Sequence, residues 1–218
     1  MQALEDCTLI HKDIKHARIK VSEDGSVRVL VPNDFTVEDI ESLINKKSCW
    51  IAKQQAYFAG KSNIELGRNQ LLLHGSRYSY FYDESVTRKV LIEHEHKTLR
   101  SAIDLIDIVN QEKWYKIIAK DYLSERTRYL SNNLGFSYKK LYVRGQRTKL
   151  GNCSEEKNIS LNWRLIKAPD EVVDYIIVHE LVHTRIMSHS SKFWILLKSH
   201  YPNYKSAIDW LDKYGNSL

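Results

Sequence analysis

Residues 172–183 constrain the fold of this 218-residue chain more than any other segment. They are apolar almost all round, yet they contain two histidines and a glutamate. A helix that is apolar on every side has to be buried. Burying His179, Glu180 and His183 is costly unless these side chains are paired or bind a metal. The segment therefore predicts a buried helix built around a polar site.

The spacing of these three residues indicates which site it is. His179 and His183 are four residues apart, which places them about 40° apart around a helix and about 6 Å along it. Both imidazoles can therefore reach one ion at the usual Zn–N distance of about 2.0–2.1 Å. Glu180 lies beside the first ligand, where it can hold the metal's water without coordinating the ion. This HExxH motif predicts two zinc ligands and a general base.

A catalytic zinc site needs a third protein ligand and an open position. His189 follows His183 by six residues, which is the third-ligand spacing of the long metzincin motif. Ile186 stands where that motif has glycine and does not easily adopt positive φ, so we expect the helix to end by a different route. No glutamate follows Glu180, which favours His189 over an acidic ligand or an exposed loop histidine. His200 is a weaker candidate.

Cys153 admits three interpretations: a nucleophile, a fourth zinc ligand, or a small side chain that packs a loop. We favour packing, because a fourth protein ligand would close the site and leave Glu180 without a role. Three widely spaced cysteines do not form a disulfide framework and fit a reducing compartment. No apolar run approaches the ~20 residues of a membrane span, and the acidic N-terminus does not resemble a secretory signal. We expect a cytoplasmic protein that does not contact a membrane.

Positive charge is concentrated in the middle of the chain. Residues 111–168 carry 13 basic and 5 acidic side chains, a surplus of +8. Such a region suits a polyanionic partner, which could be a nucleotide, a nucleic acid or an acidic polypeptide, or it is simply a solvated basic helix face. The candidates for substrate binding in this segment are Arg144, Arg147, Lys149, Asn152 and Arg164.

The periodicity of apolar residues predicts an α+β fold. The first part is β-rich, with a hairpin over 14–32 around an Asp-Gly turn, a helix capped by Thr36, and strands at 71–74, 78–82 and 90–92. The second part has a long helix of about 20 residues from 110, a β-hairpin formed by 141–143 and 159–163, the buried helix after Pro169, and short helices after Ser190 and from 204. The break near residues 95–108 is the only plausible boundary, and it divides the chain into regions 1–108 and 109–218. The alternative is one continuous domain.

Several of these motifs together resemble the YgjP-like metallopeptidase family, small bacterial relatives of the SprT-like zincins. The resemblance rests on Leu150-Gly151-Asn152-Cys153, Leu161-Asn162-Trp163, Pro169, the HELVH segment, His189 and Phe193-Trp194. It implies a compact zincin-like metallohydrolase core, zinc ligands at His179, His183 and His189, and a catalytic Glu180. Leu150 and Asn152 replace the family's Trp and Ser, so substrate preference differs if this loop lines the cleft.

Three functions follow from these observations. The first is a zinc metallopeptidase acting on polypeptides, with Glu180 as general base for the attacking water. The second is a nucleoside triphosphate pyrophosphatase, an activity also assigned to YgjP-like proteins, which the basic segment favours. No Walker-type glycine loop supports this alternative. The third is a DNA-binding module with structural zinc, whose binding would weaken with salt.

Overall fold

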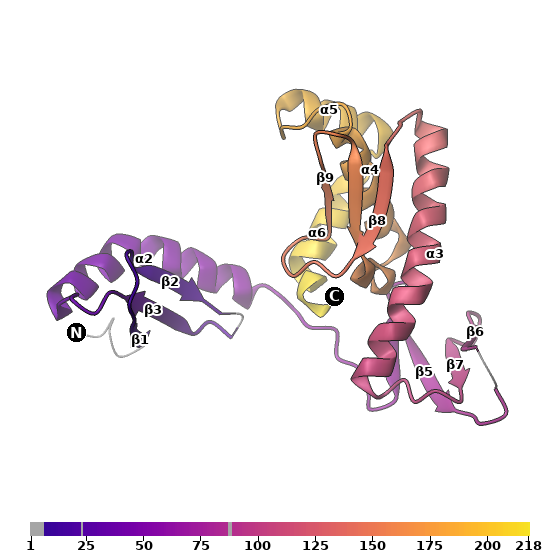
Figure 1. Ribbon diagram of the computed structural model, residues 1–218, viewed down its shortest axis with the longest axis horizontal. Coiled ribbons are helices and arrows are strands. Elements are labelled where there is room, and N and C mark those ends of the chain that lie inside the picture. Colours follow the sequence, from indigo (N-terminus) through magenta and orange to yellow (C-terminus); the bar gives the residue numbers. More distant parts are fainter. Residues whose placement is uncertain (1–6, 23, 87–88) are drawn as a thin grey trace. The chain divides into compact units, whose positions relative to one another are not determined.

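The computed structural model describes residues 7–22, 24–86 and 89–218. The chain forms two compact units, residues 1–63 (unit 1) and 64–218 (unit 2). Both contain helices and small sheets (Figure 1), in agreement with the predicted α+β class. Among the described residues, no helix combines the length and apolar character needed to cross a membrane.

The described residues of unit 1 form a three-stranded sheet and a helix. The sheet has the order β1 (Cys7–His11), β3 (Val27–Val31), β2 (Arg18–Val21). The predicted hairpin is confirmed as the antiparallel pair β2–β3, with Gly25 at a φ of 80° in the turn. The parallel strand β1 was not predicted. Valines of the sheet pack against one side of helix α2 (Val37–Ala59).

Helix α2 begins as its sequence predicts. The Asp39 backbone N–H donates to Thr36 Oγ1 at 3.2 Å, and the Thr36 N–H donates to Asp39 Oδ2 at 3.0 Å. This reciprocal capping box satisfies two backbone donors at the helix start. The helix extends beyond residue 51, the last position that the apolar pattern predicted, and ends at Ala59.

Unit 2 contains two sheets. The first has four strands in the order β4 (Gln70–Leu73), β5 (Ser76–Tyr82), β7 (Thr98–Ser101), β6 (Leu91–Glu93). Strand β7 pairs in parallel with β5, although its sequence lies where we predicted only a break. Helix α3 (Ile108–Leu134) follows, capped by Asp107 and ended by Gly135 at a φ of 68°.

The second sheet corrects one expectation. Its order is β8 (Lys140–Arg144), β10 (Asn158–Asn162), β9 (Gly151–Cys153). Strands β8 and β10 are parallel, so the predicted hairpin between 141–143 and 159–163 is wrong, and β9 is the antiparallel partner of β10. The reason lies in the connecting segment, because part of it forms β9, which runs back along the sheet before β10 begins. Asn162 Nδ2 also donates to the carbonyls of Gln146 and Lys149, which ties the segment to the end of β10.

The rest of unit 2 is helical. The elements are η1 (Trp163–Lys167), α4 (Asp170–His183), α5 (Ser191–His200), α6 (Tyr204–Tyr214) and η2 (Gly215–Ser217). Ser190 occupies the predicted N-cap position of α5, but its side chain makes no capping hydrogen bond.

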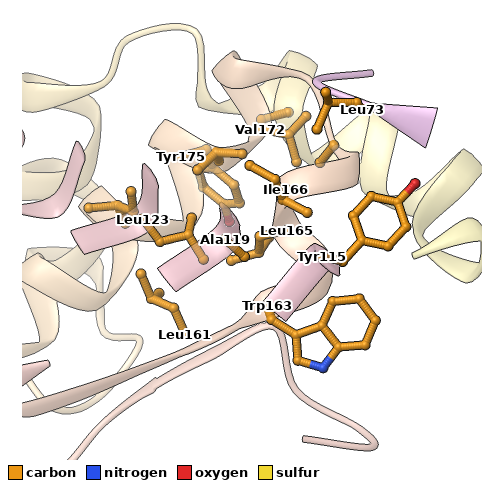
Figure 2. Packing of buried hydrophobic residues seen from close by; sticks show 14 of the residues in the cluster. Leu73, Tyr115, Ala119, Leu123, Leu161, Trp163, Leu165, Ile166, Val172 and Tyr175 are labelled. Atoms are coloured by element: carbon orange, nitrogen blue, oxygen red, sulfur yellow. The ribbon is translucent and has the colours of Figure 1, made fainter. Parts of the chain in front are cut away.

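One hydrophobic core holds unit 2 together. Figure 2 shows side chains of α3, β10, η1 and α4 packed together, with Leu73 of β4 among them. Because the strands of the first sheet share this core, the compact units divide at 63/64, whereas the sequence suggested 108/109. The backbone reinforces this connection, since the N–H groups of His74 and Gly75 donate to the carbonyls of Ile166 and Lys167.

Candidate metal centre

Three histidines converge at the end of α4. The Nε2 atoms of His179, His183 and His189 lie 3.0–3.2 Å from one another. In the part of the chain that the structure describes, this is the only group of three or more His, Cys, Asp or Glu side chains whose ligand atoms converge in this way. The three predicted ligands are therefore brought to one point.

The triangle of nitrogens has the size that a metal ion requires. Tetrahedral ligation at a Zn–N distance of about 2.0–2.1 Å places the nitrogens about 3.3–3.4 Å apart. The observed separations agree within a few tenths of an ångström. Hydrogen bonds alone cannot satisfy three mutually adjacent Nε2 atoms, because a neutral imidazole carries one proton. The residues present therefore fit a divalent ion.

The end of α4 explains how His189 reaches the other two ligands. The helix stops at His183, and the backbone N–H groups of Arg185 and Ile186 both donate to the Val182 carbonyl. No described residue from 184 to 190 has a positive φ, so the chain turns without the glycine of the metzincin motif, as predicted. Helix α5 begins at Ser191, two residues after His189.

The protonation states of His179 and His183 suit metal binding. His183 Nδ1 donates to the Ile186 carbonyl at 3.0 Å, which fixes the tautomer and leaves the Nε2 lone pair for a ligand. Burial, assisted by the neighbouring charges of His183 and His189, lowers the pKa of His179 to about 3. Burial also lowers the pKa of His183. Ligating imidazoles have to be neutral, and these two are neutral at physiological pH.

Phe193 forms the floor of the site. Its ring centroid lies 4.9 Å from that of His179, 4.6 Å from that of His183 and 4.8 Å from that of His189. The side chain is fully buried on α5. It therefore restrains all three imidazoles through packing. The sequence analysis identified Phe193 only through the family resemblance. It did not predict the packing against the histidines, because residue spacing does not show which side chains lie under a site.

Glu180 follows the ligand candidate His179 on α4, and its side chain is tightly enclosed. The residue is 5% exposed, and its Oε2 atom is buried without a hydrogen-bond partner. A Cβ added at Gly151 of β9 would lie 2.7 Å from Glu180 Oε1. Only a residue without a side chain lets the carboxylate lie against this strand. Sequence reasoning missed this requirement, since the contact joins residues that are far apart along the chain.

Burial raises the pKa of Glu180 to about 8, against the opposing charge of Lys149. A nearby cation favours the carboxylate form, so an ion on the triad would act in the same direction as Lys149. Cys153 is half-buried on β9, and burial with the Glu180 charge raises the pKa of its thiol to about 11. A thiol that stays protonated is a poor nucleophile and ligand. This agrees with a packing role.

The predicted substrate-binding residues lie on β8, on β9, on the segment between these strands and on η1. The guanidinium groups of Arg144 and Arg164 lie over the rings of Tyr142 and Trp163, at 4.3 and 4.5 Å from their centroids. The three further candidates are Arg147 and Lys149, which are exposed in the segment before β9, and Asn152, which lies on β9 next to Gly151. Of these, Lys149 acts electrostatically on the Glu180 carboxyl group.

Two other predicted side chains have structural partners. Asn152 Oδ1 accepts a hydrogen bond from Gln146 Nε2 at 2.7 Å. His200, the weaker metal candidate, packs its ring against Phe136 at 4.9 Å and is not part of the triad.

A buried helix with HExxH and a third histidine is the arrangement of a metallopeptidase. The pattern of the YgjP-like family, described as "YgjP-like, metallopeptidase domain", matches residues 15–214. The chain therefore belongs to the YgjP-like metallopeptidase family, as the resemblance implied. Membership implies a metal ion and a polypeptide substrate, whereas it lends no support to nucleotide or nucleic-acid partners.

Solved structures with a similar region include two archaeal metallopeptidase zymogens. Abylysin of Pyrococcus abyssi is 22% identical, with a TM-score of 0.37, over 41% of this chain and 90% of its own. Jannalysin of Methanocaldococcus jannaschii is 21% identical, with a TM-score of 0.36, over the same shares. The search of curated proteins returned no match.

Proposed function

We propose that this protein is a zinc-dependent peptidase in which His179, His183 and His189 hold the ion and Glu180 is the general base. The observation that carries the proposal is the convergence of three Nε2 atoms within 3.2 Å beside a buried carboxylate oxygen that has no partner. Neutral imidazoles leave the charge of the ion uncompensated, which suits a catalytic site better than a structural one.

The bound zinc would supply Lewis acidity, polarising a carbonyl oxygen and easing the deprotonation of water. Glu180 Oε2 is the atom free to accept that proton, because it makes no other hydrogen bond. The same oxygen can deliver the proton to the leaving amine nitrogen. Gly151 of β9 leaves the space that this carboxylate occupies, because a Cβ at that position would lie 2.7 Å from Oε1.

Strand β9 offers a binding surface for an extended peptide. It is an edge strand, with β10 on one side and no strand of the described residues on the other. The hydrogen bonds of Leu150 and Ser154 to the β10 side imply that the backbone groups of Gly151 and Cys153 point to the open edge. A peptide that added to this edge would run past Glu180, because Gly151 of β9 lies against the Glu180 side chain. Main-chain pairing of this kind accepts many peptide sequences.

The test is a comparison of the wild-type chain with Glu180→Gln. Glutamine has nearly the same shape but cannot accept the proton, so hydrolysis of an unfolded protein such as casein should fall by about 10²–10⁴-fold. Zinc content, measured by mass spectrometry, should stay at the wild-type level. His183→Ala is the matched control, which should lose the metal as well as the activity. Full activity in Glu180→Gln would rule out this role.

A further inference from the structure

Unit 1 contains a hollow that the catalytic proposal does not use. It lies between strand β2 and helix α2, has a volume of about 230 Å³, and is lined by Ala17, Ile19, Leu43, Lys47 and Trp50. Pockets for drug-sized ligands measure about 300–1,000 Å³, so this hollow suits a single apolar side chain. Trp50 at its margin is 43% exposed.

The wall formed by β2 is an open strand edge. In the order β1, β3, β2, strand β2 is outermost, and no other strand of the described residues pairs with it. The Ser22 N–H donates to the Ser26 carbonyl, which places residues 18, 20 and 22 on the β3 side of the ladder. The N–H and C=O groups of Ile19 and Val21 therefore point to the open edge. Backbone groups of this kind recruit an extended peptide.

The charge beside the hollow is mostly positive. Strand β2 and helix α2 together carry five Lys and Arg side chains, and their three acidic residues, Glu38, Asp39 and Glu41, all lie near the start of α2. Lys47 lines the hollow itself, and Arg18 and Lys20 are exposed on β2. A partner with carboxylates on either side of an apolar residue would complement this surface.

We infer that unit 1 is a docking site for an extended acidic peptide, which adds as a strand to β2 and places one apolar side chain between Ile19, Leu43 and Trp50. The open strand edge favours a peptide over a nucleic acid, because only a peptide backbone can pair with the N–H and C=O groups of β2. The inference is independent of the proposed catalysis, because it concerns binding by the other compact unit.

The test uses the full chain and a fluorescent peptide of about ten residues, in which a central leucine is flanked by alternating valine and glutamate. Binding is followed by fluorescence anisotropy, and mass spectrometry checks that the peptide stays intact. We expect binding that weakens with salt. It should be lost when glutamine replaces glutamate, and also when alternate backbone nitrogens of the peptide are methylated.

Charge reversal locates the site. Lys47→Glu should weaken binding at least about tenfold through like-charge repulsion. Lys12→Glu makes the same change just after β1, at the opposite edge of the sheet, and should leave the affinity unchanged. Circular dichroism confirms that both variants fold. Equal effects of the two variants, undiminished binding of the methylated peptides, or equal competition by a single-stranded DNA of the same charge would overturn the inference.

Discussion

Helices α2 and α4 form for different reasons. Helix α2 has a capping box at Thr36 and Asp39 and buries one side through Ile40, Ile44 and Ile51. Helix α4 has no side-chain cap and buries residues on all sides, Glu180 and His183 among them. The first is specified by signals within its own sequence. Helix α4 is stable because β9, α3 and α5 pack around it. The cost of burying its polar side chains is offset only where segments distant in sequence complete the site.

The largest expected effect comes from removing a support of α4. Phe193→Ala should lower the free energy of unfolding by about 3–5 kcal/mol, because it leaves a cavity beneath three imidazoles. Zinc affinity should fall as well, since the rings lose their common packing surface. Urea denaturation and zinc titration measure the two effects.

Ile195→Ala is the control for Phe193→Ala, because Ile195 is 70% exposed on the same helix. A surface substitution of this kind should change stability by no more than about 0.5 kcal/mol. Similar losses for the two variants would mean that the packing under the histidines does not support α4.

The next effect concerns the contact between β9 and α4. Gly151→Ala should displace the Glu180 carboxylate, because the added Cβ would lie 2.7 Å from Oε1. We expect kcat for peptide hydrolysis to fall at least about tenfold, equivalent to about 1.4 kcal/mol of barrier, with zinc content and KM nearly unchanged. In Gly215→Ala an added Cβ would meet no atom within 4 Å, so that variant should retain full activity. A wild-type kcat in Gly151→Ala would show that Glu180 does not need this space.

Removing the N-cap of α2 tests whether signals within its own sequence stabilise this helix. Thr36→Ala should destabilise the helix by about 1 kcal/mol, since the Asp39 N–H loses its acceptor. Faster amide exchange in the first turns of α2 would report this loss. Ser190→Ala at the start of α5 is the matched control and should change little, because Ser190 makes no capping hydrogen bond. Equal losses would remove the distinction between capped and uncapped helices.

The smallest effect concerns the first turn of α4. Burial alone would raise the pKa of Asp170, but hydrogen bonds from Tyr122 and His74 outweigh it and hold the pKa below its usual value. The folded chain therefore gains stability above the ordinary aspartate pKa and loses it as the pH falls through the folded-state pKa. The side chain is 56% exposed, so the gain is below about 1 kcal/mol.

Asp170→Asn should remove this contribution. The difference in unfolding free energy between the variant and the wild type should shrink as the pH falls through the pKa of Asp170 in the folded chain. Urea denaturation at several pH values measures it. A difference that stays constant across that range would show that the first turn of α4 does not depend on the charge of Asp170.

Local sequence was sufficient for much of the fold. The Asp-Gly hairpin, the Thr36 cap, the long helix before Gly135 and the apolar helix after Pro169 were all predicted, because each depends on neighbours a few residues away. Strand β7 and the pairing of β10 with both β8 and β9 were not, because strand order depends on partners far along the chain.

The same division holds for the site. The sequence alone predicted which residues hold a metal, since two ligands follow from the HExxH spacing on a helix, and His189 follows from its spacing after His183 and from the absence of a later glutamate. Only the tertiary structure decided that their Nε2 atoms meet, that Phe193 lies beneath them and that Gly151 leaves room for Glu180. The physical reason is that packing and close approach depend on segments distant in sequence, and no local pattern encodes their separation in space.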